Sequence, residues 1–558
     1  MRRCRRLLYL GVILCASAEA ANYDLLIRNG TVFDGRGNPG QIADIGIRGD
    51  QILAIGDLVD AQATHLIDAQ GMAVAPGFIN MLSWATESLL IDGRGLGDLY
   101  QGVTLEVFGE GSSMGPLNES MKETMRSGQD EAKFDISWTS LGEYLEHLES
   151  NGVAPNVASF IGATTVRVHV LGHVNRPPTP GELVQMQSLV DQAMLEGALG
   201  VGSSLIYAPA FFADTHELIA LASRAAKYGG MYISHIRSEG NRLLESVDEL
   251  LQVAQKANAR AELYHLKVAG KENWLKFSPL VKKIEAARQR GLQITANIYT
   301  YTAGSTGLDA AMPPWVQEGG FKAWATRLQD PAIRTRVISE MNKPTDTWEN
   351  LLLAAGGDKT VLVGFRNPEL KHYTGKTLAD IATSKGQSVA ESAIDLVIED
   401  GSRVQVIYFL MSESNLRRKV QIPWVSFGSD ASSMSASGVF LNKSTHPRAY
   451  GNFARVLGKF VRDEKLLTLA EAIRKLTSLP AENLRIRKRG LLVEGYYADI
   501  VVFDPRTIAD TATYDAPHSL AIGVRDVVIN GIPALLDHEP TGALPGRVVR
   551  GPGWVGHQ

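Results

Sequence analysis

The sequence predicts an α/β protein: a (β/α)8 TIM-like barrel with a small β-sandwich built from both chain ends. Three observations lead to this prediction. Eight short apolar runs in the middle of the chain alternate with segments of helical periodicity. Both chain ends show short alternating strands separated by tight-turn residues. Two of the apolar runs end in a histidine and a third ends in an aspartate, as expected for strands that open onto a catalytic rim.

The apolar runs of the middle are typical of parallel strands buried on both faces. The predicted strands are 73–79, 103–108, 157–161, 199–203, 231–236, 261–268, 293–301 and 424–428. Helix-period segments such as 215–228 and 241–257 separate them, so we place the barrel at 76–484. The stretch 306–421 is too long for one connection, and we expect it to hold extra helices over the site. Pro313-Pro314-Trp315 suggests a lid-like loop there, although a plain structural insertion fits equally well.

The two chain ends share one pattern. Alternating runs precede the turn signals Asn29-Gly30 and Gly49-Asp50, and similar runs recur at 498–504 and 524–531. We therefore predict that residues 21–75 and 485–558 form one β-sandwich domain, with the barrel inserted between its halves.

The first twenty residues resemble a secretory leader. Four arginines precede an apolar stretch at 7–18, and Ala18-Glu19-Ala20 follows as a small-x-small cleavage site. The apolar run is too short for a typical membrane span, although an uncleaved anchor remains the alternative. We predict a signal peptide at 1–20, a periplasmic or secreted bacterial protein, and no membrane association after the leader is removed.

The composition and charge limit which partners and metal ligands the protein could use. The chain has 558 residues, of which 45% are hydrophobic and 21% charged, an ordinary globular composition. Loss of the leader would remove four arginines and Glu19, changing the formal net charge from −4 to −7, which gives no support for nucleic-acid binding. Both cysteines, Cys4 and Cys15, lie in the leader, so the mature chain would have no disulfides and no thiolate metal ligands.

Three polar residues at strand ends suggest the chemistry. His235 and His265 end two apolar runs one βα unit apart, and Asp430 ends the last predicted strand. Two imidazoles and a carboxylate on one barrel rim are the parts of a hydrolytic metal site. Each histidine could instead be a hydrogen-bonded structural residue, and Asp430 could be a helix N-cap.

A series of short segments points to a known family. They are GALGV at 197–201, LIYAP at 205–209, SHIRSEG at 234–240, HLK at 265–267, YTYTAGST at 299–306, GSD at 428–430, HPR at 446–448 and GYYAD at 495–499. In number and order they resemble the N-acyl-D-amino-acid deacylases, or D-aminoacylases, of the amidohydrolase superfamily. The similarity covers nearly all of the mature chain.

This resemblance implies a barrel with a terminal sandwich, zinc, and hydrolysis of an N-acyl amide. It implies that His235 and His265 are zinc ligands. Asp430 resembles the base that takes a proton from the zinc-activated water and returns it to the leaving amine. Lys267, Tyr299 and Arg448 resemble residues that bind the substrate α-carboxylate, a role that suits a point charge and a planar guanidinium. Lys267 and Arg448 could also be ordinary rim charges, and Tyr299 an amphipathic strand-end residue.

The sequence departs from the family pattern at two places. The superfamily ends its first strand with His-x-His, where this chain has Leu82 and Trp84. The deacylases also place a metal-binding cysteine after the second strand, where this chain has Gly111 beside Glu110. We expect Glu110 to replace the thiolate, because two histidines and a glutamate form an established catalytic zinc set. Glu106 is a weaker candidate, and Trp84 is expected to fill the vacated space and shape an apolar acyl pocket.

We therefore predict an exported hydrolase with about one zinc per chain. Its predicted reaction is cleavage of the amide bond of small-molecule N-acyl-(D-)amino acids. Two alternatives remain open at this point. The first is a related amidohydrolase acting on cyclic amides or dipeptides. The second is a catalytically inactive, metal-free barrel that binds amino-acid derivatives.

Overall fold

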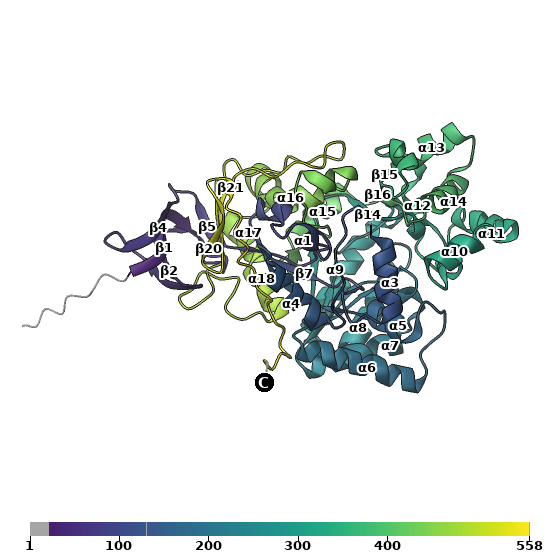
Figure 1. Ribbon diagram of the computed structural model, residues 1–558, viewed down its shortest axis with the longest axis horizontal. Helices are drawn as coiled ribbons and strands as arrows, with labels where there is room; N and C mark the ends of the chain where they lie inside the picture. Colours follow the sequence, from purple (N-terminus) through teal and green to yellow (C-terminus); the bar gives the residue numbers. More distant parts are fainter. Residues whose placement is uncertain (1–21, 130, 557–558) are drawn as a thin grey trace, which may run out of the picture.

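The computed structural model describes residues 22–129 and 131–556. The protein is an α/β structure with parallel sheets, arranged in three regions along its longest axis (Figure 1). Strands from both chain ends lie at one end of the molecule, the parallel strands and their helices form the middle, and a helical insertion lies at the other end. The leader predicted at 1–20, with both cysteines, lies outside the described residues. Within the described ranges, the helices lack the combination of length and apolar character that a bilayer crossing needs.

The two chain ends combine in one nine-stranded sheet. Its strands are β1 (Asn22–Val32), β2 (Gln41–Arg48), β3 (Gln51–Gly56), β4 (Gln62–Asp68), β5 (Ala73–Pro76), β18 (Ile500–Phe503), β19 (Val524–Ile529), β20 (Ile532–Leu536) and β21 (Glu539–Pro540). The halves meet where β5 pairs antiparallel with β18. Apolar side chains from both halves, among them Ile27, Ile47, Ile500 and Val528, share one buried cluster. The contacts that hold this sheet together therefore join residues far apart in the sequence.

Two details of this region differ from the predictions. The predicted strand 73–79 is split at Gly77, so that β5 belongs to the terminal sheet and β6 (Phe78–Asn80) to the parallel strands. A Cβ at Gly77 would lie 2.1 Å from Oγ1 of Thr104, so only glycine allows this close crossing. Asn29-Gly30 is not a hairpin turn: β1 continues to Val32, and the pairing with β2 shifts register between Ile27 and Gly30, with Asn29 at φ 56°.

The middle region contains two parallel sheets. One has the order β6–β7–β8, where β7 is Val103–Phe108 and β8 is Asn156–Ser159. The other contains β9 (Ile161–Gly162), β10 (Gly200–Ser204), β11 (Met231–His235), β12 (Ala261–Leu263), β13 (Ile294–Ile298) and β17 (Val425–Phe427). The predicted strand 157–161 is thus divided between β8 and β9. All predicted runs contain a strand, and the predicted site residues lie at or after the carboxyl ends of these strands, except Arg448, which begins α16.

Helices accompany the parallel strands. They are α1 (Ser88–Ile91), α2 (Leu96–Leu99), α3 (Glu119–Gly128), α4 (Leu141–Asn151), α5 (Ala163–Leu171), α6 (Pro180–Leu195), α7 (Thr215–Lys227), α8 (Leu243–Ala257), α9 (Phe277–Gln289), α15 (Glu413–Val420), α16 (Arg448–Arg455), α17 (Leu469–Leu476) and α18 (Ser478–Leu484). Their ends follow local sequence signals: Thr179 and Glu182 form a capping box with Pro180 at the start of α6. The helices predicted at 215–228 and 241–257 are confirmed as α7 and α8.

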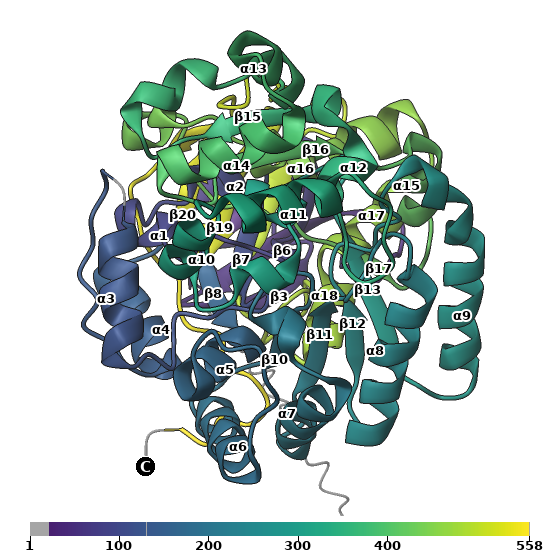
Figure 2. The same ribbon diagram turned by 90° about the vertical axis from the view of Figure 1, so that its right-hand side faces the viewer.

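The insertion contains the expected helices and also a sheet that was not predicted. Its helices are α10 (Phe321–Arg327), α11 (Pro331–Met341), α12 (Leu351–Ala355), α13 (Leu378–Lys385) and α14 (Val389–Asp400). Its antiparallel strands have the order β14 (Ala303–Gly307), β16 (Gln405–Phe409) and β15 (Thr360–Gly364). Figure 2, seen from the insertion, shows α10 and α11 in front of the parallel strands. Ala269, Tyr299 and Tyr301 from the loops after β12 and β13 belong to its core, so the insertion packs directly on the site.

Candidate metal centre

Glu110 reaches the site from a sharply bent loop after β7. Its neighbours Gly109 and Gly111 have φ angles of 108° and 71°, which favour glycine. A Cβ at Gly111 would lie 2.5 Å from the Cβ of Ser204. A side chain at position 111 would therefore collide with β10. The side chain that this loop directs into the site is instead the carboxylate of Glu110.

Glu110, His235 and His265 converge on one point. Oε1 of Glu110 lies 3.1 Å from Nδ1 of His235 and 2.8 Å from Nε2 of His265. The two imidazole rings are 4.5 Å apart between centroids and nearly perpendicular. All three side chains are buried, and one ligand atom from each lies within 4.8 Å of the others. Burial alone would raise the pKa of Glu110, but the adjacent imidazoles hold it well below its ordinary value.

Glu239 supports both histidines from behind, and sequence reasoning did not single it out. Its carboxylate lies 3.0 Å from Nδ1 of His265, 3.5 Å from Nε2 of His235 and 2.8 Å from Nζ of Lys267. Each histidine therefore presents one ring nitrogen to Glu110 and the other to Glu239. A carboxylate on the outer nitrogen fixes the tautomer and orientation of a metal-ligating histidine. The only sequence signal was its place in SHIRSEG, four residues after His235.

This donor set fits a divalent metal ion. Two neutral imidazoles and a carboxylate form a catalytic zinc set that leaves a coordination position open. The outer carboxylate supplies the partner that such histidines commonly have. The alternative ligand Glu106 does not join the cluster: it is fully buried within β7, and its Oε2 accepts a 3.0 Å hydrogen bond from Asn80.

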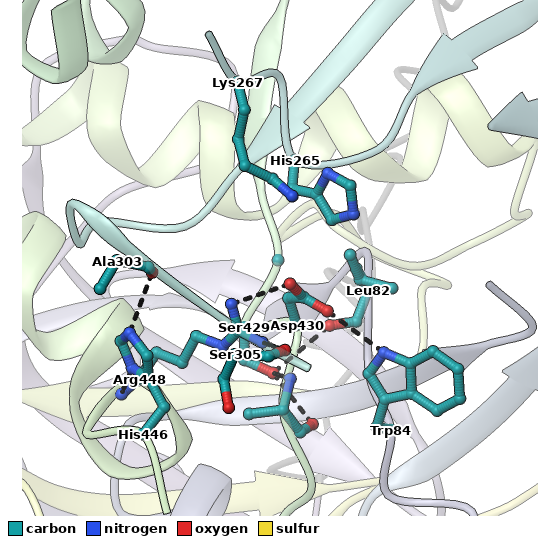
Figure 3. A network of polar contacts seen from close by, with 12 residues as sticks. Leu82, Trp84, His265, Lys267, Ala303, Ser305, Ser429, Asp430, His446 and Arg448 are labelled. Atoms are coloured by element: carbon teal, nitrogen blue, oxygen red, sulfur yellow. Dashed lines mark hydrogen bonds and ion pairs between the residues drawn. The ribbon is translucent and has the colours of Figure 1, made fainter. Parts of the chain in front are cut away.

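Asp430 lies beside this cluster, at the end of β17. Its backbone has φ 52°, and its N–H donates to the Leu82 carbonyl at 2.8 Å. Its Oδ2 pairs with Nη1 of Arg448 at 2.8 Å, while Oδ1 accepts a 3.2 Å hydrogen bond from Trp84 (Figure 3). Burial raises the pKa of Asp430 despite the Arg448 charge, and the Glu110 charge adds to the rise. A left-handed backbone at a non-glycine residue is uncommon and is typical of functional positions.

His265 is positioned by the neighbouring strand. It has φ 33°, and its backbone N–H donates to Oδ1 of Asn297 on β13 at 2.9 Å. Nδ2 of Asn297 in turn donates to Glu262 at 2.8 Å. Burial raises the pKa of Glu262 to about 7. A polar chain inside the parallel sheet therefore holds the second histidine in place, although Asn297 and Glu262 had not been noted in the sequence.

Two further predicted residues, Lys267 and Arg448, flank a third, the buried Tyr299. The Arg448 guanidinium lies 4.5 Å from the centroid of the Tyr299 ring, and Nζ of Lys267 lies 5.9 Å from it. Among the described residues, the Tyr299 hydroxyl and Nε of Arg448 are buried polar atoms without a hydrogen-bond partner. His446 accepts from the Arg448 backbone N–H at 3.0 Å, which fixes the start of α16. The structure thus offers unpaired donors beside Asp430.

All seven predicted site residues therefore lie in one buried group: Glu110, His235, His265, Lys267, Tyr299, Asp430 and Arg448. Parallel strands within an α/β fold, ending in two histidines and a glutamate, define a hydrolase of the metal-dependent type.

A family model described as "Amidohydrolase family" matches residues 425–534. The D-aminoacylase of Alcaligenes xylosoxydans xylosoxydans is 32% identical over 536 residues, covering 96% of this chain and 99% of that protein. A crystal structure of a D-aminoacylase aligns with a TM-score of 0.78 and 31% identity, over 95% of this chain and all of the other. The N-acyl-D-glutamate deacylase of Bordetella bronchiseptica, solved with zinc and a phosphonate inhibitor, aligns with a TM-score of 0.78, 29% identity and the same coverage. The chain belongs to the D-aminoacylases of the amidohydrolase family.

Proposed function

We propose that this protein hydrolyses the amide bond of N-acyl-D-amino acids and releases a carboxylate and a free amino acid. The observation that carries the proposal is the convergence of Glu110, His235 and His265 beside the buried carboxyl of Asp430. Full-length similarity to a D-aminoacylase and to a zinc-containing N-acyl-D-glutamate deacylase supports the reaction class and the D configuration.

Glu110, His235 and His265 would hold one zinc ion, and Glu239 would orient both imidazoles. Zinc bound there supplies a Lewis acid for the amide carbonyl and lowers the pKa of water to about 7. The chain's remaining task is to bind the substrate and to move a proton from the attacking water to the leaving nitrogen.

Asp430 is suited to carry that proton. Its carboxyl is held by Trp84 on one oxygen and by Arg448 on the other, and burial raises its pKa above the ordinary value, which is the direction that favours a general base. In the proposed reaction it accepts a proton from water during attack on the acyl carbon. It then donates this proton to the amine nitrogen as the C–N bond breaks.

The substrate α-carboxylate is assigned to Arg448, Lys267 and Tyr299. Arg448 and Tyr299 carry buried donors that lack hydrogen-bond partners within the described protein, and the two cations flank the same aromatic ring. A carboxylate bound there would place the neighbouring amide beside Asp430.

We further propose that the two parallel sheets close into one eight-stranded barrel. In support, the Met81 N–H donates to Phe427 at 3.3 Å, and Ser83 forms a parallel bridge with Ala431, linking β6 to β17. On the other side only Phe160 separates β8 from β9. A closed barrel would direct all site residues to one rim.

We propose a periplasmic or secreted location on the leader pattern at 1–20 alone. Amino-terminal sequencing of protein recovered from the periplasm should begin close to residue 21. An uncleaved amino terminus would overturn the signal-peptide assignment.

The function is tested by metal analysis together with a substrate panel. Purified protein should contain about one zinc per chain and hydrolyse N-acyl-D-amino acids faster than their L enantiomers. A matched Asp430→Asn variant should retain zinc and lose most of its activity. Protein that takes up no zinc, or that is equally active without it, would overturn the proposal.

A further inference from the structure

A single indole N–H links two carboxylates of the site. Nε1 of Trp84 lies 3.0 Å from Oε2 of Glu110 and 3.2 Å from Oδ1 of Asp430. Figure 3 shows the indole directed at Asp430 rather than away from it. The N–H edge of Trp84 thus faces the polar centre. The sequence had suggested only that this residue fills space and shapes an apolar acyl pocket, so its role is larger than expected.

Trp84 is held in this position by its backbone. Its N–H donates to the Ala431 carbonyl at 2.9 Å, and its own carbonyl accepts from Oγ of Ser432 at 3.0 Å. Both contacts are to the loop that carries Asp430. The ring and the carboxylate that it touches are therefore fixed to the same short segment, while the bond to Glu110 reaches across to the loop after β7.

Two buried carboxylates that face one another need a positive partner between them. In proteins this partner is commonly a metal ion, a shared proton or a cationic side chain. An indole N–H can donate but has no lone pair for a metal ion. Trp84 donates to one oxygen of each carboxylate. Its ring occupies the space between Glu110 and Asp430 and cannot act as a metal ligand.

We propose that Trp84 is a positioning residue that ties Asp430 to the metal-binding carboxylate of Glu110 and limits the centre to one divalent cation. The inference rests on the proposed function, since it concerns the same centre. Trp84 acts through the two carboxylates: it directs the free electron pairs of Asp430 toward the attacking water, and it prevents a second cation from bridging Asp430 and Glu110.

The first test measures zinc stoichiometry. Metal-depleted protein is dialysed against increasing free zinc, and bound zinc is measured by mass spectrometry. Wild type should saturate at about one zinc per chain, and Trp84→His, which places an imidazole ligand beside two carboxylates, should take up a second. Wild type that binds two ions, or Trp84→His that binds only one, overturns the inference. Wild type that binds none overturns the proposed function instead.

The second test distinguishes the effect of the indole N–H from the effect of the size of the ring. Trp84→Phe keeps an aromatic ring but removes the donor, and should lower kcat about 10- to 100-fold with little change in KM and unchanged zinc stoichiometry. Trp554→Phe, at an exposed position near the carboxyl end, is the matched control and should leave kcat unchanged. A Trp84→Phe variant with wild-type kcat contradicts the positioning role.

Tryptophan fluorescence provides a readout that does not depend on activity. Zinc that binds Glu110 changes the surroundings of the indole, so zinc titration of metal-depleted wild type should change the emission. The change should persist in Trp554→Phe and disappear in Trp84→Phe. An undiminished change in Trp84→Phe would show that Trp84 does not contact the metal-binding carboxylate, and would overturn the inference even if Trp84→His fails to fold.

Discussion

Replacing Glu239 by glutamine tests whether the outer carboxylate organises the metal centre. The substitution keeps the size of the side chain and removes its charge. Three groups lose their common anionic neighbour: Nζ of Lys267 at 2.8 Å, Nδ1 of His265 at 3.0 Å and Nε2 of His235 at 3.5 Å. The surrounding charges hold the pKa of Glu239 far below its ordinary value, so the carboxylate is ionised at every pH at which the enzyme would work.

The size of the effect follows from these contacts. Loss of an outer partner of a metal-ligating histidine reduces metal affinity by about 10- to 100-fold, and Glu239 serves both histidines, so we expect the upper end of that range. This is about 2.7 kcal/mol of binding free energy. Removing one partner of the buried pair with Lys267 should also destabilise the fold by about 3–5 kcal/mol.

Zinc affinity is measured by competition with a chromophoric chelator, and stability by denaturant unfolding of the metal-free protein. Glu245→Gln is the matched control, because Glu245 is exposed on α8 and should leave both quantities unchanged. Glu110→Gln is the stronger perturbation, since it removes one of the proposed zinc ligands. A Glu239→Gln protein that binds zinc as tightly as the wild type would refute the positioning argument.

Two more predictions concern substrate binding and stability. Arg448→Lys keeps the charge but loses the planar fork, so KM should rise about tenfold for N-acyl-D-amino acids and hardly at all for the corresponding amides; an equal rise for both would exclude a carboxylate contact. Glu262 keeps its proton up to about pH 7 in the fold, whereas the unfolded chain loses it near 4.5, so its contribution to stability falls as pH rises between these values. The free energy of unfolding of Glu262→Gln, measured with urea, should therefore rise by roughly 3 kcal/mol relative to that of the wild type between pH 4 and pH 8. A difference in unfolding free energy that stays constant over this range would contradict the prediction.

The sequence was informative about the strands and their end residues because both leave local signals. Buried parallel strands read as apolar runs, and a histidine or aspartate at the end of such a run is conspicuous. His235 is the last residue of β11, and His265 and Asp430 follow β12 and β17 by two and three residues. Parallel pairing then brings these chain-distant positions to one edge, which explains why the predicted residues lie together.

Other features could not be predicted because they depend on contacts between distant segments. Glu239 faces the histidines only because its loop packs against the insertion. There the backbone N–H of Glu239 donates to Oε2 of Glu349 at 2.5 Å. Gly77 divides one apolar run between two sheets because Thr104 crosses it closely. Asn29-Gly30 is a common hairpin signal, yet here it forms a bulge inside a strand. In each case the local sequence fits several structures, and tertiary packing selects one of them.

The charges of the proposed site fit a single divalent cation. The buried carboxylates of Glu110, Glu239 and Asp430 face two buried cations, Lys267 and Arg448. When both imidazoles are neutral, as they must be to bind zinc, these charges sum to one excess negative charge. A single divalent cation changes this to one excess positive charge, which a substrate carboxylate would neutralise. A second divalent cation would add two more positive charges to a buried site, and an unbalanced buried charge is costly. The Trp84 N–H avoids this cost because it satisfies two carboxylate oxygens without adding a formal charge.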